Sequence, residues 1–581
     1  MKRQRKRKDV IRRCAAALCC ALLLLPSAEA LAQPGEIVGW AASQPFKETP
    51  EIRYSHPGGV YAQSILKIRV QAPAGYLIAC TTDGSAPSPA DSLGFGEVWV
   101  RLEKGETGYL LAHREQLFCP LDRALPREDG ELPRGAVLRV ALLDEHGRFA
   151  AQDAQIYYLG EDFARRYPGC LVVSLWTDPE NLLDEERGLL NPGLIYEEWA
   201  KSEEGQEAIR KREWWLYESN ATQRGIAWER PCRLSIYDGG RRPAVELTAG
   251  LRISGRASRR LSQKAFALYF RKEYGQKQLN WPLFEGSGST RSFLLQAGGE
   301  NAEGWKIKDG LLQSLAEGRA VAASRARPAV LFLNGEYWGP YLLREKVSGK
   351  LLEDRFGIPS EEAVIVKNGD LEEGVEEDLA SYEALEAFAK MDLGVQENFR
   401  AFSECADIRS FAEACAFRIY IGDDDWSWGS NEILWRARCG TPEQRKWHWM
   451  FHDLDCSAGL YSDAETAAAR DHFLRAVENY PLFASALRNE GFRELFCRCL
   501  RETADRVCAP ERIEKTAAEW ETTWAPLLPD WYRRYDLSPT AWEQGKQMTL
   551  DFFRMRKSLL LPAVDRDLRE LEQEHRGMLP E

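Results

Sequence analysis

The sequence lacks the short motifs by which several common protein classes are identified. It has 14 cysteines but no Cys-x-x-Cys pair, and zinc-binding domains usually rely on such pairs. Neither Gly-x-x-x-x-Gly-Lys nor Gly-x-Gly-x-x-Gly occurs, so the ordinary nucleotide-binding loops are missing. There is no internal repeat or low-complexity tract. These absences argue against zinc domains, P-loop NTPases, dinucleotide-binding folds and repeat proteins.

Apolar runs long enough to span a bilayer are also missing. The N-terminus has a basic stretch, an apolar run from Cys14 to Leu25 of about 12 residues, and then Pro26 with small residues. This order is typical of a secretory signal peptide. The alternative is an uncleaved anchor helix, but the run is shorter than the ~20 residues that a bilayer requires. We therefore predict a signal peptide at residues 1–32 and a secreted or cell-surface protein with no transmembrane segment after cleavage.

Basic residues are scarce in the predicted mature chain. The first 32 residues hold eight basic and two acidic side chains, so 69 Lys and Arg remain against 87 Asp and Glu, a net charge of −18. A surface this acidic argues against nucleic acid as a partner. Eleven cysteines remain, and an odd number leaves at least one thiol unpaired in a monomer.

The segment 48–160 has the pattern of a β-sandwich. Short alternating runs such as 65–70 and 137–142 are separated by Gly, Pro, Asp and Ser turns. The run Thr81–Pro87 resembles the Thr-Thr-Asp-Gly-Ser-x-Pro turn of the β-sandwich domain appended to chitobiase-type enzymes. Asp83-Gly84 suits a tight turn, because glycine accepts a positive φ without strain. In that family the domain is usually an accessory, and binding of a cell-surface glycan is the alternative role.

The rest of the chain mixes helices and strands. From Leu171 on, strand patterns alternate with helical ones, and the last hundred residues are helix-rich, as in Pro510–Trp524 and Met548–Leu559. The second half is therefore predicted to be α+β.

Carboxylates embedded in aromatic sequence are the clearest candidates for chemistry. The run Trp447–Asp455 ends in Asp453 and Asp455, which would share one face if a strand continued through them. Carboxylates so close repel each other, and a divalent cation would relieve that repulsion. The run Ile421–Asn431 adds three aspartates and an amide beside two tryptophans.

A second set of candidates is basic or amphoteric. The run Gly250–Arg260 combines glycine, hydroxyl and guanidinium groups, which suit an anionic ligand such as phosphate. It leads through Gln263-Lys264 into the predicted strand 265–270. The run Val330–Gly339 predicts a β-hairpin with Asn-Gly at its turn, and the return strand carries Glu345.

Phosphoryl transfer from a metal–nucleotide requires parts of this kind: a cation on the phosphates, a glutamate to orient it, an aspartate for the acceptor hydroxyl and Asp or Asn groups for the metal. Each residue also has a plain structural interpretation. Lys264 and Glu345 could form surface ion pairs, Asp424 could cap a helix, and Asp455 could sit in a turn.

The order of these segments resembles one family. The matching segments are Leu171–Leu182, Trp228–Pro231, Gly250–Arg259 with Gln263-Lys264, Phe332–Tyr341 with Arg344-Glu345, Gly422–Trp435 and Trp449–Asp455. Together they are similar to the kinase-like domain of the spore-coat-protein-H-like (CotH) family, over about 168–562, with 563–581 left as a tail. The resemblance implies an atypical protein-kinase-like domain behind the small β-sandwich. It also implies ATP and Mg²⁺ or Mn²⁺ as cofactors, and phosphorylation of hydroxyl side chains on extracytoplasmic proteins.

The resemblance also implies roles for residues. Asp425 would be the catalytic aspartate. Lys264 would contact the nucleotide phosphates and Glu345 would position it. The remaining expected ligands are Arg256 and Arg259 for the nucleotide, and Asn431, Asp453 and Asp455 for the metal.

This chain departs from the family at several positions. The family's Ile-His-Gly is Ile253-Ser254-Gly255 here, its Lys-Ser is Lys264-Ala265, and its Arg-Asn-Gly-Gly-Asn-Asp is Gln296–Asn301. The spacing from Asp425 to Asn431 is one residue longer than usual. A catalytically inactive surface or adhesion protein that binds protein or glycan is therefore the main alternative. Glycoside hydrolysis by the paired carboxylates is a third, and nothing else in the sequence marks a sugar cleft.

Overall fold

The structure is a computed structural model that describes residues 49–104, 108–426 and 430–577. It mixes helix and sheet, 41% and 24% of residues respectively, as the α+β prediction requires. Contacts group Glu48–Glu581 into one compact unit. The predicted signal peptide lies outside the described residues. Within those residues, no helix is both long and apolar enough to cross a membrane.

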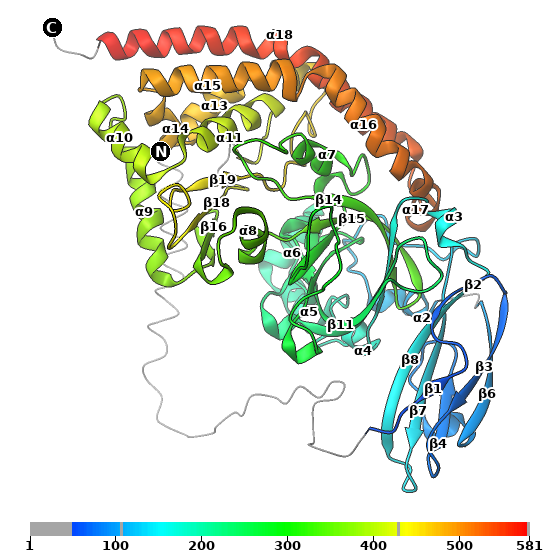
Figure 1. Ribbon diagram of the computed structural model, residues 1–581. Coiled ribbons are helices and arrows are strands. Elements are labelled where there is room, and N and C mark those ends of the chain that lie inside the picture. The colour runs from blue at the N-terminus through cyan, green and yellow to red at the C-terminus, as the bar shows by residue number, and fades with distance from the viewer. Residues whose placement is uncertain (1–48, 105–107, 427–429, 578–581) are drawn as a thin grey trace. The chain divides into compact units, whose positions relative to one another are not determined.

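The first part of the described chain is a β-sandwich (Figure 1, blue to cyan). One sheet has the order β1-β3-β6, with β1 at Arg53–Tyr54, β3 at Ile65–Gln71 and β6 at Glu97–Glu103. The other has the order β2-β8-β7-β4-β5, with β2 at Gly59–Tyr61, β8 at Phe149–Leu159, β7 at Ala136–Leu143, β4 at Leu77–Thr81 and β5 at Ser92–Phe95. Alternate residues of both sheets, such as Ile68, Val100 and Leu138, bury one shared core.

The turn after β4 has the predicted geometry. Gly84 takes a φ of 91°, and Asp83 accepts hydrogen bonds from the backbone N–H and hydroxyl of Ser85 at 2.9 and 2.6 Å. The hydroxyl of Thr81 donates to the Ser85 carbonyl at 2.6 Å. The tight turn is therefore confirmed, while the likeness to the chitobiase-type domain stays a prediction.

A closed barrel follows, with the strand order β10-β11-β12-β13-β15-β14-β9. Its strands are β9 (Leu171–Trp176), β10 (Arg230–Tyr237), β11 (Val245–Ser254), β12 (Ala265–Tyr269), β13 (Ser292–Gln296), β14 (Ala326–Leu333) and β15 (Glu336–Glu345). Side chains such as Leu251, Phe266 and Leu343 fill the interior. The opposite faces of β14 and β15, with Phe332 and Leu342, pack into a second core shared with the helices.

The predicted hairpin is β14–β15, with Asn334 and Gly335 at its turn at φ 48° and 84°. Its turn contacts the sandwich, where Gly135 N donates to the Gly335 carbonyl at 2.8 Å. Glu336 accepts hydrogen bonds from the N–H groups of Leu110 and Leu111 at 2.5 and 3.3 Å. Leu110 and Leu111 lie in helix α2 (Tyr109–Ala112). Sandwich and barrel are thus joined through buried polar contacts.

A four-stranded sheet and a layer of helices complete the fold (Figure 1, yellow-green to red). The sheet has the order β17-β16-β18-β19, with β16 at Ala363–Lys367, β17 at Asp370–Glu373, β18 at Ile433–Ala437 and β19 at His448–Met450. The remaining helices are α3 (Phe163–Arg166), α4 (Glu180–Leu183), α5 (Gly193–Lys201), α6 (Glu203–Lys211), α7 (Lys308–Ser314), α8 (Gly349–Phe356), α9 (Leu379–Ala387), α10 (Gln396–Cys405), α11 (Ile408–Ile421), α12 (Ala464–Ala469), α13 (His472–Asn479), α14 (Pro481–Ala486), α15 (Glu490–Glu502), α16 (Pro510–Trp524), α17 (Leu528–Tyr535) and α18 (Pro539–Gly577).

Two predictions about these elements have clear outcomes. The helix Pro510–Trp524 is confirmed as α16, and Met548–Leu559 lies within α18. Asp453 and Asp455 would share one face only if a strand continued through them, and this condition is not met, because β19 ends at Met450 and Asp453 takes a φ of 54°. The two carboxylates therefore lie in a loop, where strand alternation does not apply. The eleven described cysteines are all free thiols.

Candidate functional site

Three consecutive aspartates follow α11, which ends because Gly422 takes a left-handed φ of 67°. Asp423 is buried and forms an ion pair with Arg418. The carboxylate of Asp424 is bound by three basic side chains: Arg470 at 2.8 Å, His472 at 3.3 Å and Arg475 at 2.5 Å. Asp425 has no ion pair of this kind among the described residues, so it is the one aspartate of the three whose charge is not neutralised locally.

Asp425 is held by an amide. Asn431 Nδ2 donates to Asp425 Oδ2 at 3.2 Å and to the backbone carbonyl of Asp453 at 3.2 Å. Asn431 takes a φ of 60°, a left-handed conformation that asparagine tolerates better than most residues. One amide therefore joins the loop after α11 to the Asp453 loop. Residues 427–429 of the first loop lie outside the described residues.

Asp455 is bound by a glycine turn from another part of the chain. Glu300 N donates to Asp455 Oδ2 at 2.8 Å, and Asn301 Nδ2 donates to the Asp455 carbonyl at 3.1 Å. A Cβ at Gly299 would lie 2.1 Å from Asp455 Oδ2, and Gly299 has a φ of 54°. This close approach requires glycine. The segment Gln296–Asn301, where the sequence departs from the family pattern, is thus in contact with the aspartate pair.

A buried ion pair supports the loop that contains Asp453 and Asp455. Asp309 of α7 pairs with Arg344 of β15, and both side chains are almost fully buried. The other oxygen of Asp309 accepts a hydrogen bond from Leu454 N at 2.8 Å. Lys308 Nζ, from the same helix, donates to the Ser457 carbonyl at 2.8 Å. Helix α7 therefore holds both sides of the Asp453–Asp455 loop.

Cations lie on the other side of Asp453. Lys367, at the end of β16, places Nζ 2.7 Å from His452 Nε2. Burial lowers the pKa of Lys367 and brings the pKa of His452 well below its usual range, with the Lys367 charge adding to the effect on the histidine. A neutral imidazole beside an ammonium group accepts its proton in a hydrogen bond.

The two aspartates of the loop resist ionisation. Burial raises the pKa of Asp453 to about 7, and the charge of Asp309 adds to this, while Lys367 and Arg344 act in the opposite direction. Burial raises the pKa of Asp455 well above its usual range, and the charges of Asp453 and Asp309 raise it further. The cluster therefore has more negative charge than its own cations neutralise, which is the environment that binds a cation.

The structure does not bring the predicted Lys264 and Glu345 together. Both residues are described, and each has other partners. Lys264 Nζ donates to the carbonyls of Arg259 and Leu261, both at 3.1 Å, and burial lowers its pKa. Glu345 accepts a hydrogen bond from Arg325 N at 2.8 Å and lies 3.6 Å from Arg355. The expected contact between them is replaced by these local contacts.

The two predicted arginine ligands also differ from each other. Arg259 is buried, and its guanidinium donates to the carbonyls of Gly255, Ala221 and Gln223 at 2.7, 3.1 and 2.8 Å. Burial lowers its pKa to about 10. It therefore fixes the loop between β11 and β12 rather than presenting a free charge. Arg256 is exposed at the tip of that loop.

The donor set fits a cation that is shared with phosphates. No three His, Cys, Asp or Glu side chains in the described part of the chain are placed to hold a metal ion alone. Mg²⁺ in nucleotide sites is typically held by one or two carboxylates, with the phosphates supplying the rest. The Asp453 carboxylate accepts no hydrogen bond from the described residues, so its oxygens are available, and Asp425 and Asn431 lie beside it.

Comparison with known families decides the assignment. A family model described as CotH kinase protein matches residues 251–560, more than half of the chain. This chain belongs to the CotH kinase family. No curated protein matches it. The matched range includes every predicted site residue, from Arg256 to Asp455. The kinase-like character of the fold follows from membership of this family.

Three residues of this CotH chain were not identified as site residues from the sequence. Asp309 and Lys308 were overlooked because a Lys-Asp pair at the start of a helix is common on protein surfaces. Arg344 was passed over for its neighbour Glu345, although adjacent strand residues face opposite sides. The signal that could have found the pair is burial: Lys308 and Asp309 begin a helix whose next residues, Leu311 and Leu312, are core residues.

Proposed function

We propose that this CotH protein is an active kinase that transfers phosphate from ATP to hydroxyl side chains of extracytoplasmic or surface proteins. The observation that carries the proposal is the environment of Asp425. Its two neighbours are paired with arginine and histidine side chains, whereas Asp425 has no such ion pair among the described residues and is held by Asn431 next to Asp453. A carboxylate in this position can accept the proton of an acceptor hydroxyl.

Each remaining residue has a defined part in the transfer. Asp453 and Asp455 would hold the divalent cation, which when bound neutralises charge on the nucleotide phosphates. Lys367 is placed to attract the phosphates. In the reaction the acceptor oxygen bonds to the γ-phosphorus, the bond from that phosphorus to ADP breaks, and the hydroxyl proton passes to Asp425.

The Arg344–Asp309 pair supports the same function. In protein kinases an ion pair between a strand lysine and a helix glutamate must be in place for activity. Here the pair joins β15 to α7, and its carboxylate also accepts the N–H of Leu454 between the two metal aspartates. The positions of Asp453 and Asp455 thus depend on this pair.

The substrate class and location rest on the sequence. The predicted signal peptide at 1–32 supports export, and an exported kinase would act on extracytoplasmic proteins. The sandwich, with a cell-surface glycan as a candidate partner, would help to place the enzyme at the cell surface.

One observation favours a second function. Lys264, the expected phosphate ligand, is buried and bound to two carbonyls. If Lys367 does not take over its role, the chain would be a non-catalytic surface protein that binds protein or glycan. That function predicts no affinity for nucleotide.

Nucleotide binding separates the two. Thermal unfolding of the mature protein would be followed with Mg-ATP and Mn-ATP, for the wild type, Asp453→Ala and the exposed control Asp238→Ala. At a hundredfold excess over Kd, binding should add about 2.7 kcal/mol of stability. A shift in the wild type and the control that is lost in Asp453→Ala supports the kinase. No shift with either metal would reject it and favour the binding protein.

A further inference from the structure

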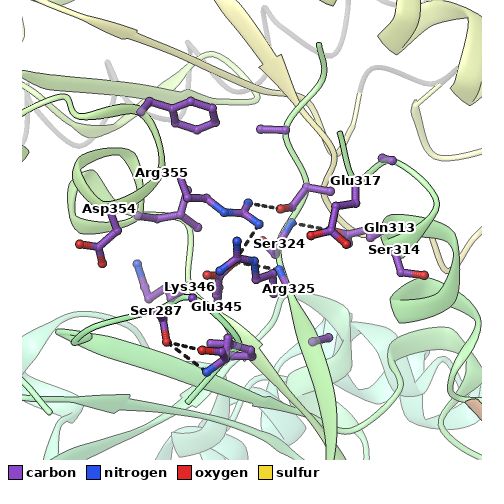
Figure 2. Close-up of a pocket in the computed structure, with 18 of the residues that line it drawn as sticks. Ser287, Gln313, Ser314, Glu317, Ser324, Arg325, Glu345, Lys346, Asp354 and Arg355 are labelled. Atoms are coloured by element: carbon purple, nitrogen blue, oxygen red, sulfur yellow. Dashed lines mark hydrogen bonds and ion pairs between the residues drawn. The ribbon is translucent and has the colours of Figure 1, made fainter. Parts of the chain in front are cut away.

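A cavity of about 620 Å³, with Glu345 in its wall, lies at the end of the barrel. Its walls are α7, the segment 316–326 that leads into β14, the end of β15, helix α8 and the loop 284–290 (Figure 2). A volume of this size is typical of sites for small organic ligands rather than for a single ion.

The cavity is more basic than the chain around it. Five basic and three acidic side chains line it, although the whole chain has a net charge of −12. Two of these cations, Arg325 and Lys346, have no carboxylate within ion-pair distance among the described residues. Arg325 NH1 donates to the Glu285 carbonyl at 2.7 Å, which leaves its other N–H groups available. A cavity with two uncompensated cations favours an anionic occupant.

The cations converge on one point. In Figure 2 Arg325, Glu345 and Arg355 meet in the middle of the cavity. Arg355 lies 3.6 Å from Glu345 and donates to the carbonyl of Ala323. Burial lowers the pKa of Arg355, the charge of Glu345 acts in the opposite direction, and the charge of Arg325 lowers the pKa further. A phosphate in the cavity could bind both arginines, because guanidinium matches phosphate oxygens with paired hydrogen bonds.

Hydroxyl groups line the same cavity without partners of their own. The Ser324 side chain is about nine-tenths buried, with 6% of its surface exposed, and its hydroxyl makes no hydrogen bond to the described residues. The Ser289 hydroxyl, in the glycine-rich loop, likewise has none. Ser324 is buried and Ser289 is half-buried, and both hydroxyls can form hydrogen bonds with a polar occupant of the cavity.

We propose that this cavity binds a small phosphate-bearing molecule with hydroxyl groups, of the sugar-phosphate class, and that its occupancy acts on the aspartate cluster. Arg325, Lys346 and Arg355 bind the phosphate. Ser289, Ser324 and the free oxygen of Glu345 bind the hydroxyls.

The route to the cluster is a short chain of hydrogen bonds. Ser324 N, in the cavity wall, donates to Gln313 Oε1 at 3.1 Å. Gln313 Nε2 donates to Asp309 Oδ1 at 2.9 Å, and the same oxygen accepts the N–H of Leu454. Asp309 also pairs with Arg344, the neighbour of Glu345. A ligand that moves Ser324 or Glu345 therefore acts on the residue that holds the metal-binding loop. This coupling step depends on the proposed function, whereas the binding step does not.

Binding is tested without nucleotide or metal. Titration calorimetry of the full mature protein would use glucose 6-phosphate, glucose and inorganic phosphate as probes. We expect glucose 6-phosphate to bind, and Arg325→Ala or Lys346→Gln to weaken it by about tenfold or more, the loss expected for one charged hydrogen bond. The exposed control Arg114→Ala and the cluster variant Asp453→Ala should bind as the wild type does.

Three results would overturn the binding step. The first is no heat with any phosphate probe. The second is loss of binding in Asp453→Ala, which would place the phosphate in the aspartate cluster. The third is binding of inorganic phosphate alone with equal affinity in Arg325→Ala, Lys346→Gln and the wild type, which would be an adventitious ion only.

Coupling is tested by measuring Mg-ATP affinity with the cavity empty and saturated with glucose 6-phosphate. In the wild type we expect the Kd for Mg-ATP to differ by about fivefold or more between the empty and the saturated cavity. In Gln313→Met, which keeps the volume but not the hydrogen bonds, glucose 6-phosphate should still bind and the change should disappear. Equal Mg-ATP affinities in the wild type would overturn the coupling, and failure of Mg-ATP to bind at all would instead reject the proposed kinase.

Discussion

Two regions of the molecule bury carboxylates in opposite ways, one beside the barrel and one in the loop after β19. Glu229 is bound by Arg271 at 2.8 Å, by Arg252 at 3.1 Å and by the hydroxyl of Tyr274 at 3.1 Å, so its charge is fully neutralised. Asp453 and its neighbour Asp455 face further carboxylates instead, and the Asp453 side chain accepts no hydrogen bond from the described residues.

The difference distinguishes a buried carboxylate that stabilises the fold from one that is kept for a binding site. A buried charge is costly unless it is paired, so Glu229 stabilises the fold only together with its two arginines. The Asp453 pair remains uncompensated, and such a site persists because the surrounding structure, here Asp309 and Arg344, supports it. Substitution should therefore have opposite effects on stability in the two regions.

The largest effect is expected at Asp425. Asp425→Asn keeps the shape but cannot accept a proton, so phosphate transfer should fall by at least about 100-fold. The readout is phosphate incorporation into an acceptor protein with radiolabelled ATP. The unfolding temperature and Mg-ATP binding should stay as in the wild type, and unchanged transfer in this variant would rule out Asp425 as the base.

The next largest effect is on folding at Glu229. Glu229→Ala leaves Arg252 and Arg271 without their carboxylate and should lower the free energy of unfolding by about 3 kcal/mol. Urea denaturation measures this value. The control is Glu246→Ala, an exposed residue of the neighbouring strand, which should change it by less than about 0.5 kcal/mol. If Glu229→Ala and Glu246→Ala lowered the free energy of unfolding equally, the ion pairs of Glu229 would not stabilise the fold as proposed.

Glu336 is an intermediate case, because it is hydrogen-bonded but has no ion pair within 4 Å among the described residues. Burial raises its pKa to about 7, while Arg534 and the N–H of Leu110 act in the opposite direction. The folded state holds the proton of Glu336 more tightly than the unfolded state does. The Glu336 carboxyl group therefore does not lower the free energy of unfolding below about pH 4.5. Between about pH 4.5 and pH 7 it lowers the free energy of unfolding progressively as the pH rises.

Glu336→Gln keeps an acceptor for Leu110 and should remove that dependence. We expect it to unfold at a higher temperature than the wild type at pH 7.5, by an amount equivalent to about 2 kcal/mol, and at a similar temperature at pH 4.5. Scanning calorimetry at the two pH values makes the measurement. If the unfolding temperatures of the two proteins differed equally at both pH values, ionisation of the Glu336 carboxyl group would not be the cause.

The smallest effect is expected at Asp453. Asp453→Asn removes one of the repelling carboxylates and should raise the free energy of unfolding by about 1 kcal/mol at pH 8 without metal. Urea denaturation again serves as the measurement. A loss of stability comparable to that of Glu229→Ala would show that the two regions do not differ.

The fold could be predicted where local pattern determines it. Alternation of apolar residues gave the strands of the sandwich, and Asn334-Gly335 gave the hairpin turn, because these conformations depend on a few neighbouring residues. Asp425, Asn431 and Asp453 could be grouped for a related reason, since their motifs are short and rich in charge. Their roles stay predictions.

Contacts between distant segments could not be predicted. Lys264 follows a loop whose own carbonyls at Arg259 and Leu261 bind its ammonium group, and this depends on how the loop folds back. The pairing of Asp309 with Arg344 joins residues 35 positions apart, and no local pattern indicates it. Which of two adjacent residues, Arg344 or Glu345, faces the cluster depends on the register of β15.

The contact between the hairpin turn and the sandwich has a practical consequence. Gly335 and Glu336 bond to Gly135, Leu110 and Leu111, and the two leucines also pack into the core of the barrel. A recombinant fragment that starts near residue 168 would therefore expose apolar barrel residues to water. Such a fragment is expected to be poorly soluble. For purification and crystallisation, the shortest sensible boundary lies before the sandwich, near residue 48, and the sandwich acts as a built-in folding partner for the strand that carries Arg344.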